Sequence, residues 1–122
     1  MAKRILVVDD ETELVKAMQI RLQRAGYEVL GAYDGQEALD KVQEEKPDLI
    51  ILDLMLPKID GYEICRILKS DEAYKKILIM MLTARAQESE ERLGFETGAD
   101  AYISKPFEHE VVLAKIKELL KD

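Results

Sequence analysis

Five short apolar runs, separated by stretches long enough to form helices, constrain the fold of this chain more than any other feature. The runs predict strands at residues 4–8, 27–32, 49–53, 77–82 and 101–104. Between and after them, apolar side chains recur three and four positions apart, which predicts helices at about 11–25, 36–45, 62–70, 86–96 and 108–121. Since each strand is joined to the next through a helix, the strands are expected to be parallel and covered on both faces. The sequence therefore predicts an α/β fold of the (βα)5 type, with a doubly wound five-stranded parallel sheet.

Size and charge narrow the class of protein. The 122 residues, of which 48% are hydrophobic and 35% charged, predict one globular domain over residues 1–122. A formal net charge of -7 argues against direct binding to nucleic acid, because an acidic surface repels phosphates. The apolar run near the N-terminus is too short for a signal peptide, and no stretch approaches the roughly 18–20 apolar residues of a membrane span. These observations predict a cytoplasmic protein that does not contact a membrane.

Polar residues stand where four of the predicted strands end. Asp53 lies between two apolar runs, at the end of the third strand, where an ionised carboxylate is costly. Asp9 and Asp10 follow the first strand, Thr83 follows the fourth and Lys105 follows the fifth. Because parallel strands end at the same edge of a sheet, these side chains are expected to converge there.

Such a set of residues predicts a site for a phosphoryl group. Three neighbouring carboxylates repel one another, and a divalent cation with oxygen ligands, such as Mg²⁺, relieves that repulsion. Lys105 and the hydroxyl of Thr83 can bind phosphoryl oxygens, and an aspartate such as Asp53 can act as a nucleophile that forms an aspartyl phosphate. A simpler alternative is that Asp9 and Asp10 cap the first helix, Asp10 as a capping pair with Glu13.

Five short motifs in order along the chain resemble the receiver domain of bacterial two-component response regulators. The resemblance covers essentially the whole sequence, implies a flavodoxin-like fold, and is closest in pattern to the winged-helix DNA-binding subfamily. The motifs are Val7-Val8-Asp9-Asp10-Glu11, Leu52-Asp53-Leu54-Met55-Leu56-Pro57, Asp60-Gly61, Met81-Leu82-Thr83-Ala84 and Lys105-Pro106-Phe107.

The resemblance implies roles for the residues of these motifs. Asp53 would accept a phosphoryl group from the phosphohistidine of a sensor histidine kinase or of a phosphotransfer protein. Asp10 would ligate Mg²⁺ directly, Asp9 largely through water, and Asp53 and the backbone carbonyl of Met55 would complete the set. In the same family Lys105 would bind phosphoryl oxygens and would precede a cis peptide bond.

The resemblance also implies how a signal leaves the site. Thr83 would bind a phosphoryl oxygen by moving toward Asp53, and Tyr102 would be the aromatic switch that rotates inward in response. An output domain or partner protein would then be bound by the face formed by the helix at 86–96, the strand at 101–104 and the last helix. Met55 and Arg85 would flank the path of attacking water, which predicts slow self-dephosphorylation.

The predicted function is therefore a phosphorylatable signalling switch, and three alternatives stay open. An aspartyl-nucleophile Mg²⁺ phosphatase would use the same chemistry, but that class usually has a second acid two residues after the nucleophile, where this chain has Met55. A flavodoxin-like cofactor binder would need a loop rich in glycine and hydroxyl groups after the first strand, where this chain has acids. A degenerate receiver that acts only by contact would not need the acids, Thr83 and Lys105.

Overall fold

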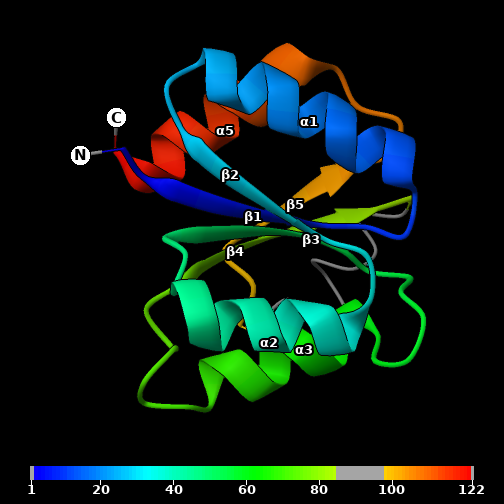
Figure 1. Ribbon diagram of the computed structural model, residues 1–122, viewed down its shortest axis with the longest axis vertical. Coiled ribbons are helices and arrows are strands. Elements are labelled where there is room, and N and C mark those ends of the chain that lie inside the picture. Colours follow the sequence, from blue (N-terminus) through cyan, green and yellow to red (C-terminus); the bar gives the residue numbers. More distant parts are fainter. Residues whose placement is uncertain (1, 85–97, 122) are drawn as a thin grey trace.

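A single sheet of five parallel strands, in the order β2-β1-β3-β4-β5, separates two layers of helices (Figure 1). The computed structural model describes residues 2–84 and 98–121. The predicted helix at 86–96 lies outside the described residues, and the predicted doubly wound parallel sheet is confirmed. The strands are β1 (Arg4–Val8), β2 (Glu28–Ala32), β3 (Leu49–Asp53), β4 (Leu78–Thr83) and β5 (Ala101–Ser104), and the helices are α1 (Thr12–Arg24), α2 (Gly35–Glu45), α3 (Gly61–Lys69) and α5 (His109–Leu120).

The helices cover both faces of the sheet, α1 and α5 on one face and α2 and α3 on the other (Figure 1). The side chains of β1 alternate between the two layers. Ile5 and Val7 join the core beneath α1 and α5, whereas Leu6 and Val8 join the core beneath α2 and α3. All four are fully buried, which explains why this strand is an unbroken apolar run in the sequence. None of the described helices is long and apolar enough to cross a membrane.

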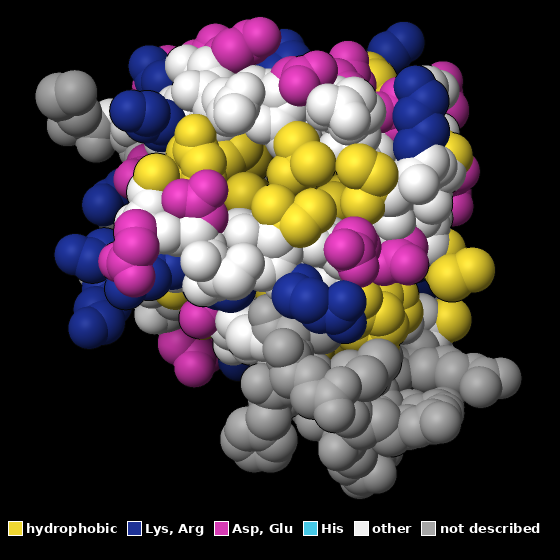
Figure 2. All heavy atoms as spheres, turned by 90° about the horizontal axis from the view of Figure 1, so that it is seen from below, with side chains coloured by type: hydrophobic (Ala, Val, Ile, Leu, Met, Phe, Trp, Pro, Cys, Tyr) yellow, Lys and Arg dark blue, Asp and Glu magenta, His cyan; other side chains and the backbone are white. Residues whose placement is uncertain are grey.

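Apolar side chains also reach the surface on the side of α2 and α3. Figure 2 views the molecule from that side and shows hydrophobic side chains gathered in the middle of the face. The half-buried residues that pack against the core of this layer include Leu39 of α2, Leu56 and Ile59 of the loop over residues 54–60, and Tyr62 of α3. This loop, called the β3–α3 loop below, therefore packs onto the helical layer.

The helices α2 and α3 begin in the same way, with an aspartate followed by a glycine. The carboxylate of Asp34 accepts the backbone N–H of Glu37 at 2.8 Å, and the carboxylate of Asp60 accepts the backbone N–H of Glu63 at 2.9 Å. Each aspartate thus satisfies one of the N–H groups that a helix leaves without a partner at its start. These caps define the first residues of the two helices, and both helix starts lie beside the loop that joins β3 to α3.

The start of α1 corrects one prediction. The sequence predicts a capping pair of Asp10 and Glu13, but Glu11 is the N-cap residue and its side chain makes no capping hydrogen bond. The carboxylate of Asp9 instead accepts the backbone N–H of Glu11 at 3.0 Å and sets the turn that leads into the helix. The predicted capping role of Asp10 is therefore wrong, and its exposed carboxylate belongs to the acidic cluster described next.

Candidate functional site

The carboxyl-terminal edge of the sheet brings the predicted site residues together. Asp53 and Thr83 are the last residues of β3 and β4. Asp9 and Lys105 lie just beyond β1 and β5, and backbone hydrogen bonds extend the ladder to them: Asp9 donates to the carbonyl of Ala32 at 3.1 Å and Lys105 donates to that of Thr83 at 2.8 Å. The backbone thus fixes four of the predicted residues at one edge, although they are far apart in the sequence.

Asp9, Asp10 and Asp53 form an acidic cluster in which one carboxylate oxygen of each lies within 4.8 Å of the others. Asp9 is fully buried and Asp53 is 5% exposed, whereas Asp10 faces solvent. Oxygen ligands from carboxylates, with room for water on the exposed side, are the donor set that suits Mg²⁺. The residues present therefore fit the predicted metal.

Lys105 supplies a positive charge to the cluster. Its Nζ lies 2.9 Å from Oδ2 of Asp9 and 3.4 Å from Oδ1 of Asp53. Burial alone would lower the pKa of Lys105, but the hydrogen bond and the charge of Asp9, followed by those of Asp53, raise it above its ordinary value. The ammonium group is therefore charged at neutral pH, yet one lysine cannot neutralise three carboxylates.

The surroundings of Asp53 disfavour its charge when no metal is bound. Burial, followed by the charge of Asp9, raises the pKa of Asp53, while Lys105 and the backbone N–H of Met55 act in the opposite direction. The N–H of Met55 donates to Oδ1 of Asp53 at 3.3 Å. A cation placed among the three carboxylates would offset the repulsion from Asp9 and favour the charged form of Asp53.

The chain folds back closely after Asp53. The N–H of Gly61 donates to the carbonyl of Leu54 at 2.9 Å, and a Cβ atom at Gly61 would lie only 2.6 Å from the carbonyl oxygen of Asp53. Only glycine permits this approach. The β3–α3 loop, which carries Met55, is thereby tied to the backbone of β3, and Met55 itself is 78% exposed.

The predicted switch residues lie on neighbouring strands. Thr83 is buried at the end of β4, and Tyr102 in the middle of β5 pairs in register with Met81. Tyr102 is half-buried and packs against the core on the side of α2 and α3. Arg85, the second residue predicted to control water access, lies outside the described residues. The Lys105–Pro106 peptide bond is cis, as the resemblance predicts.

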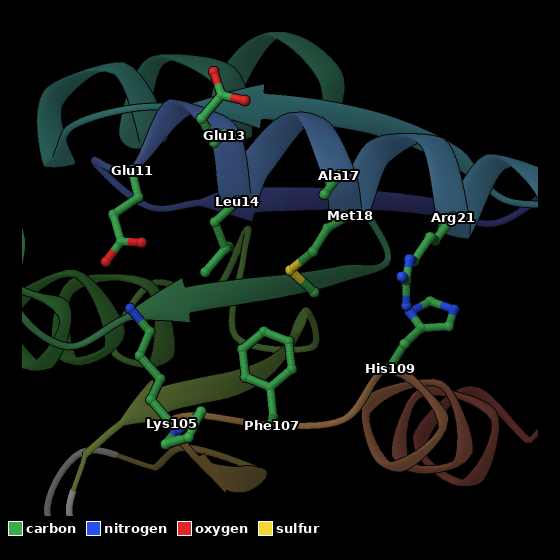
Figure 3. A pocket seen from close by; sticks show the side chains of 10 residues that line it. Glu11, Glu13, Leu14, Ala17, Met18, Arg21, Lys105, Phe107 and His109 are labelled. Atoms are coloured by element: carbon green, nitrogen blue, oxygen red, sulfur yellow. The ribbon is translucent and has the colours of Figure 1, made fainter.

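A groove of about 550 Å³ that no sequence pattern predicted is lined in part by Lys105, which contacts Asp9 of the acidic cluster. It lies between α1 and the segment that leads from β5 into α5, with the Phe107 ring pointing into it (Figure 3). Its apolar wall includes Leu14 and Met18, and Lys105 lines one part of it. Sequence patterns could not find this groove, because one wall comes from the first helix of the chain and the other from the segment before the last helix, and the two meet only after folding.

Comparison with known proteins identifies the family. The model of the response regulator receiver domain matches residues 5–117 of the chain. The chain belongs to the response regulator receiver domain family. Such domains act as phosphoacceptor switches of two-component systems and not as conventional enzymes, which agrees with the prediction from the sequence.

Relatives of this receiver domain agree with the predicted subfamily. The chain is 50% identical over 121 residues to the alkaline phosphatase synthesis transcriptional regulatory protein PhoP of Bacillus subtilis (strain 168), a match that covers 99% of the chain and 50% of that protein. The chain thus spans about half the length of this curated relative. Its similarity to a transcriptional regulator supports the resemblance to the DNA-binding subfamily.

Solved structures share the fold of this receiver domain over nearly its whole length. The chemotaxis response regulator CheY4 of Vibrio cholerae is 34% identical with a TM-score of 0.91, covering 98% of this chain and 99% of that one. The receiver domain of a sensor histidine kinase from Pseudomonas aeruginosa PAO1 is 25% identical with a TM-score of 0.88, covering all of both chains. In the latter a magnesium ion is coordinated in the active site cleft.

Proposed function

We propose that Asp53 is the phosphoacceptor of this receiver domain and that its phosphorylation depends on Mg²⁺. The observation that supports this most directly is the convergence of three carboxylates, within 4.8 Å of one another, with the ammonium group of Lys105. In the reaction a carboxylate oxygen of Asp53 attacks the phosphorus of a phosphohistidine. The O–P bond forms as the N–P bond breaks, and the imidazole nitrogen keeps the electron pair.

The metal would be held by the carboxylates of Asp10 and Asp53 and the carbonyl of Met55, with Asp9 acting largely through water. When bound, Mg²⁺ supplies positive charge that offsets both the carboxylates and the transferred phosphoryl group. Asp9 also holds the ammonium group of Lys105 at 2.9 Å, within reach of Asp53. Lys105 can therefore bind a phosphoryl oxygen on Asp53 after only a small movement.

The phosphorylated state would be read through Thr83 and Tyr102. A phosphoryl group on Asp53 adds strong hydrogen-bond acceptors at the end of β3. The hydroxyl of Thr83, on the next strand, would donate to one of them, and the half-buried ring of Tyr102 would turn inward in response. The output face would comprise β5, α5 and the predicted helix at 86–96, with a DNA-binding output domain as the reader by analogy with the PhoP relative.

The phosphoryl donor would approach along the groove shown in Figure 3. Lys105 lines this groove and also contacts Asp53, so the groove is continuous with the phosphoryl site. Its apolar wall, formed by Leu14, Met18 and Phe107, suits the apolar face of a helix that carries a phosphohistidine. A sensor histidine kinase or a phosphotransfer protein would present such a helix.

Incubation with acetyl phosphate and Mg²⁺, followed by intact mass measurement, tests the assignment. The expected result is one phosphoryl adduct, which is lost in Asp53→Ala and in EDTA but kept in His109→Ala, the matched control for the single histidine. An adduct that persists in Asp53→Ala would refute the assignment. Rapid release of phosphate from many phosphomonoesters, with no adduct, would favour the phosphatase alternative.

A further inference from the structure

The start of α2 contacts the β3–α3 loop at three points. The N–H of Gly35 points to the carbonyl of Pro57 at 3.5 Å, and Oδ2 of Asp34 pairs with Nζ of Lys58 at 3.3 Å. A Cβ atom at Gly35 would lie 2.5 Å from the carbonyl oxygen of Ile59 and 2.6 Å from its Cβ. The loop backbone therefore rests directly on the first residue of α2, in a contact that only glycine permits.

Asp34 uses both carboxylate oxygens at this contact. Oδ1 accepts the backbone N–H of Glu37 and so caps α2, while Oδ2 forms an ion pair with the ammonium group of Lys58. The hydrogen bond from Glu37 and then the interaction with Lys58 hold the pKa of Asp34 below its usual value. Glu37 in turn accepts the backbone N–H of Tyr33 at 2.6 Å, so the residues on both sides of Asp34 are fixed.

The β3–α3 loop itself has a backbone that needs such support. Lys58 has a φ of 71°, in the left-handed region that favours glycine, and the N–H of Ile59 folds back to the carbonyl of Pro57 at 2.9 Å. Leu56 and Ile59 pack against the core on the side of α2 and α3. The part of the loop that follows Met55, at Pro57, Lys58 and Ile59, is thus held from α2, an element that contributes no residue to the acidic cluster.

We propose that Asp34 and Gly35, at the start of α2, are positioning residues that set the affinity of the acidic cluster for Mg²⁺ by fixing the β3–α3 loop and the carbonyl of Met55. The inference rests on the proposed function, since it assumes that the cluster binds this metal. Outer contacts that orient metal ligands commonly change metal affinity by about 10–100-fold when they are removed.

Calorimetric titration with Mg²⁺ tests this role. Gly35→Ala is expected to raise the dissociation constant of Mg²⁺ by about tenfold. Because the ligand set is intact, saturating Mg²⁺ should restore the adduct from acetyl phosphate in Gly35→Ala but not in Asp53→Ala. The matched control is Gly26→Ala, whose φ of 102° disfavours alanine although the space around it is open. This control should lose stability while keeping the wild-type affinity for Mg²⁺.

Lys58→Met keeps the test decisive if Gly35→Ala does not fold. It removes the pair with Asp34 at a residue whose side chain is 65% exposed, and should raise the dissociation constant by about two- to fivefold. Two results would overturn the inference: wild-type affinity for Mg²⁺ in the folded variants, or an equal loss of that affinity in Gly26→Ala. The proposed function would still stand in either case if the wild type forms the phosphoryl adduct. Absence of both Mg²⁺ binding and adduct in the wild type would overturn both.

Discussion

Replacing Asp53 by Asn should stabilise the Mg²⁺-free protein at pH 7. The change removes one of three carboxylates whose oxygens lie within 4.8 Å of one another. At that distance, and with an effective dielectric constant of about 20, each like-charged pair costs about 3.5 kcal/mol. Asp53 takes part in two such pairs, with Asp9 and with Asp10. Its attraction to Lys105, at 3.4 Å, is worth about 5 kcal/mol at the same dielectric constant, which leaves about 2 kcal/mol of net repulsion.

Solvent around the exposed Asp10 weakens its part of this repulsion, whereas the burial of the charged Asp53 carboxylate adds a cost that Asn does not carry, so the expected gain in the free energy of unfolding is about 1–2 kcal/mol. That corresponds to a rise in Tm of about 3–8 °C for a chain of this length. Thermal and urea unfolding in EDTA measure it, and saturating Mg²⁺ should reduce or reverse the difference, because the metal stabilises the wild type through the carboxylate that the variant lacks.

The gain should depend on pH in a defined direction. Because the pKa of Asp53 is raised by burial and by Asp9, the folded chain holds a proton there more tightly than the unfolded chain does. The stability of the Mg²⁺-free wild type therefore falls as the pH rises from the pKa of Asp53 in the unfolded chain, about 4, through its higher pKa in the folded chain. The advantage of the Asn variant should be absent below that window and complete above it. An Asn variant less stable than the wild type at pH 7 in EDTA would refute the account of the cluster.

Three further changes test other parts of the site. Lys105→Met should lower the free energy of unfolding in EDTA by about 2–3 kcal/mol, because the carboxylate of Asp9 loses its partner. This is somewhat less than the cost of breaking a fully buried pair, and unchanged urea unfolding would contradict the pairing. Met55→Asn should shorten the lifetime of the phosphoryl adduct, followed by intact mass after acetyl phosphate is removed, since a polar side chain admits water to the phosphorus; a lifetime of seconds in both proteins would contradict this. Tyr102→Ala should abolish the changes in backbone NMR shifts of α5 that accompany phosphorylation, and shifts like those of the wild type would show that Tyr102 is not the switch.

The strands could be predicted from the sequence because of how they are buried. A central parallel strand such as β3 is covered on both faces, so every position from Leu49 to Leu52 must be apolar, and the run is visible without any structure. The convergence of Asp53 with Lys105 followed from the same topology, because parallel strands end at one edge.

Contacts between separate segments could not be predicted in this way. The predicted capping pair of Asp10 and Glu13 was wrong, because α1 begins one residue later than such a pair requires, with Glu11 as the N-cap residue and with the carboxylate of Asp9 setting the turn before it. The contact of Asp34 with Lys58 depends on how α2 packs beside the β3–α3 loop, and no local pattern encodes it. The sequence does carry a signal for close packing at the glycines beside such caps: Asp-Gly opens both α2 and α3, and in each case the glycine lies against backbone.

The chemical identity of the phosphorylated residue is the most direct test of the central claim. Borohydride reduces an aspartyl phosphate to homoserine, so treatment of the protein after incubation with acetyl phosphate and Mg²⁺ marks the acceptor. Peptide mass spectrometry should then find homoserine at position 53 and unmodified aspartate at Asp9 and Asp10. Homoserine at either of those two positions, or its absence from all three in a protein that carries the adduct, would contradict the account.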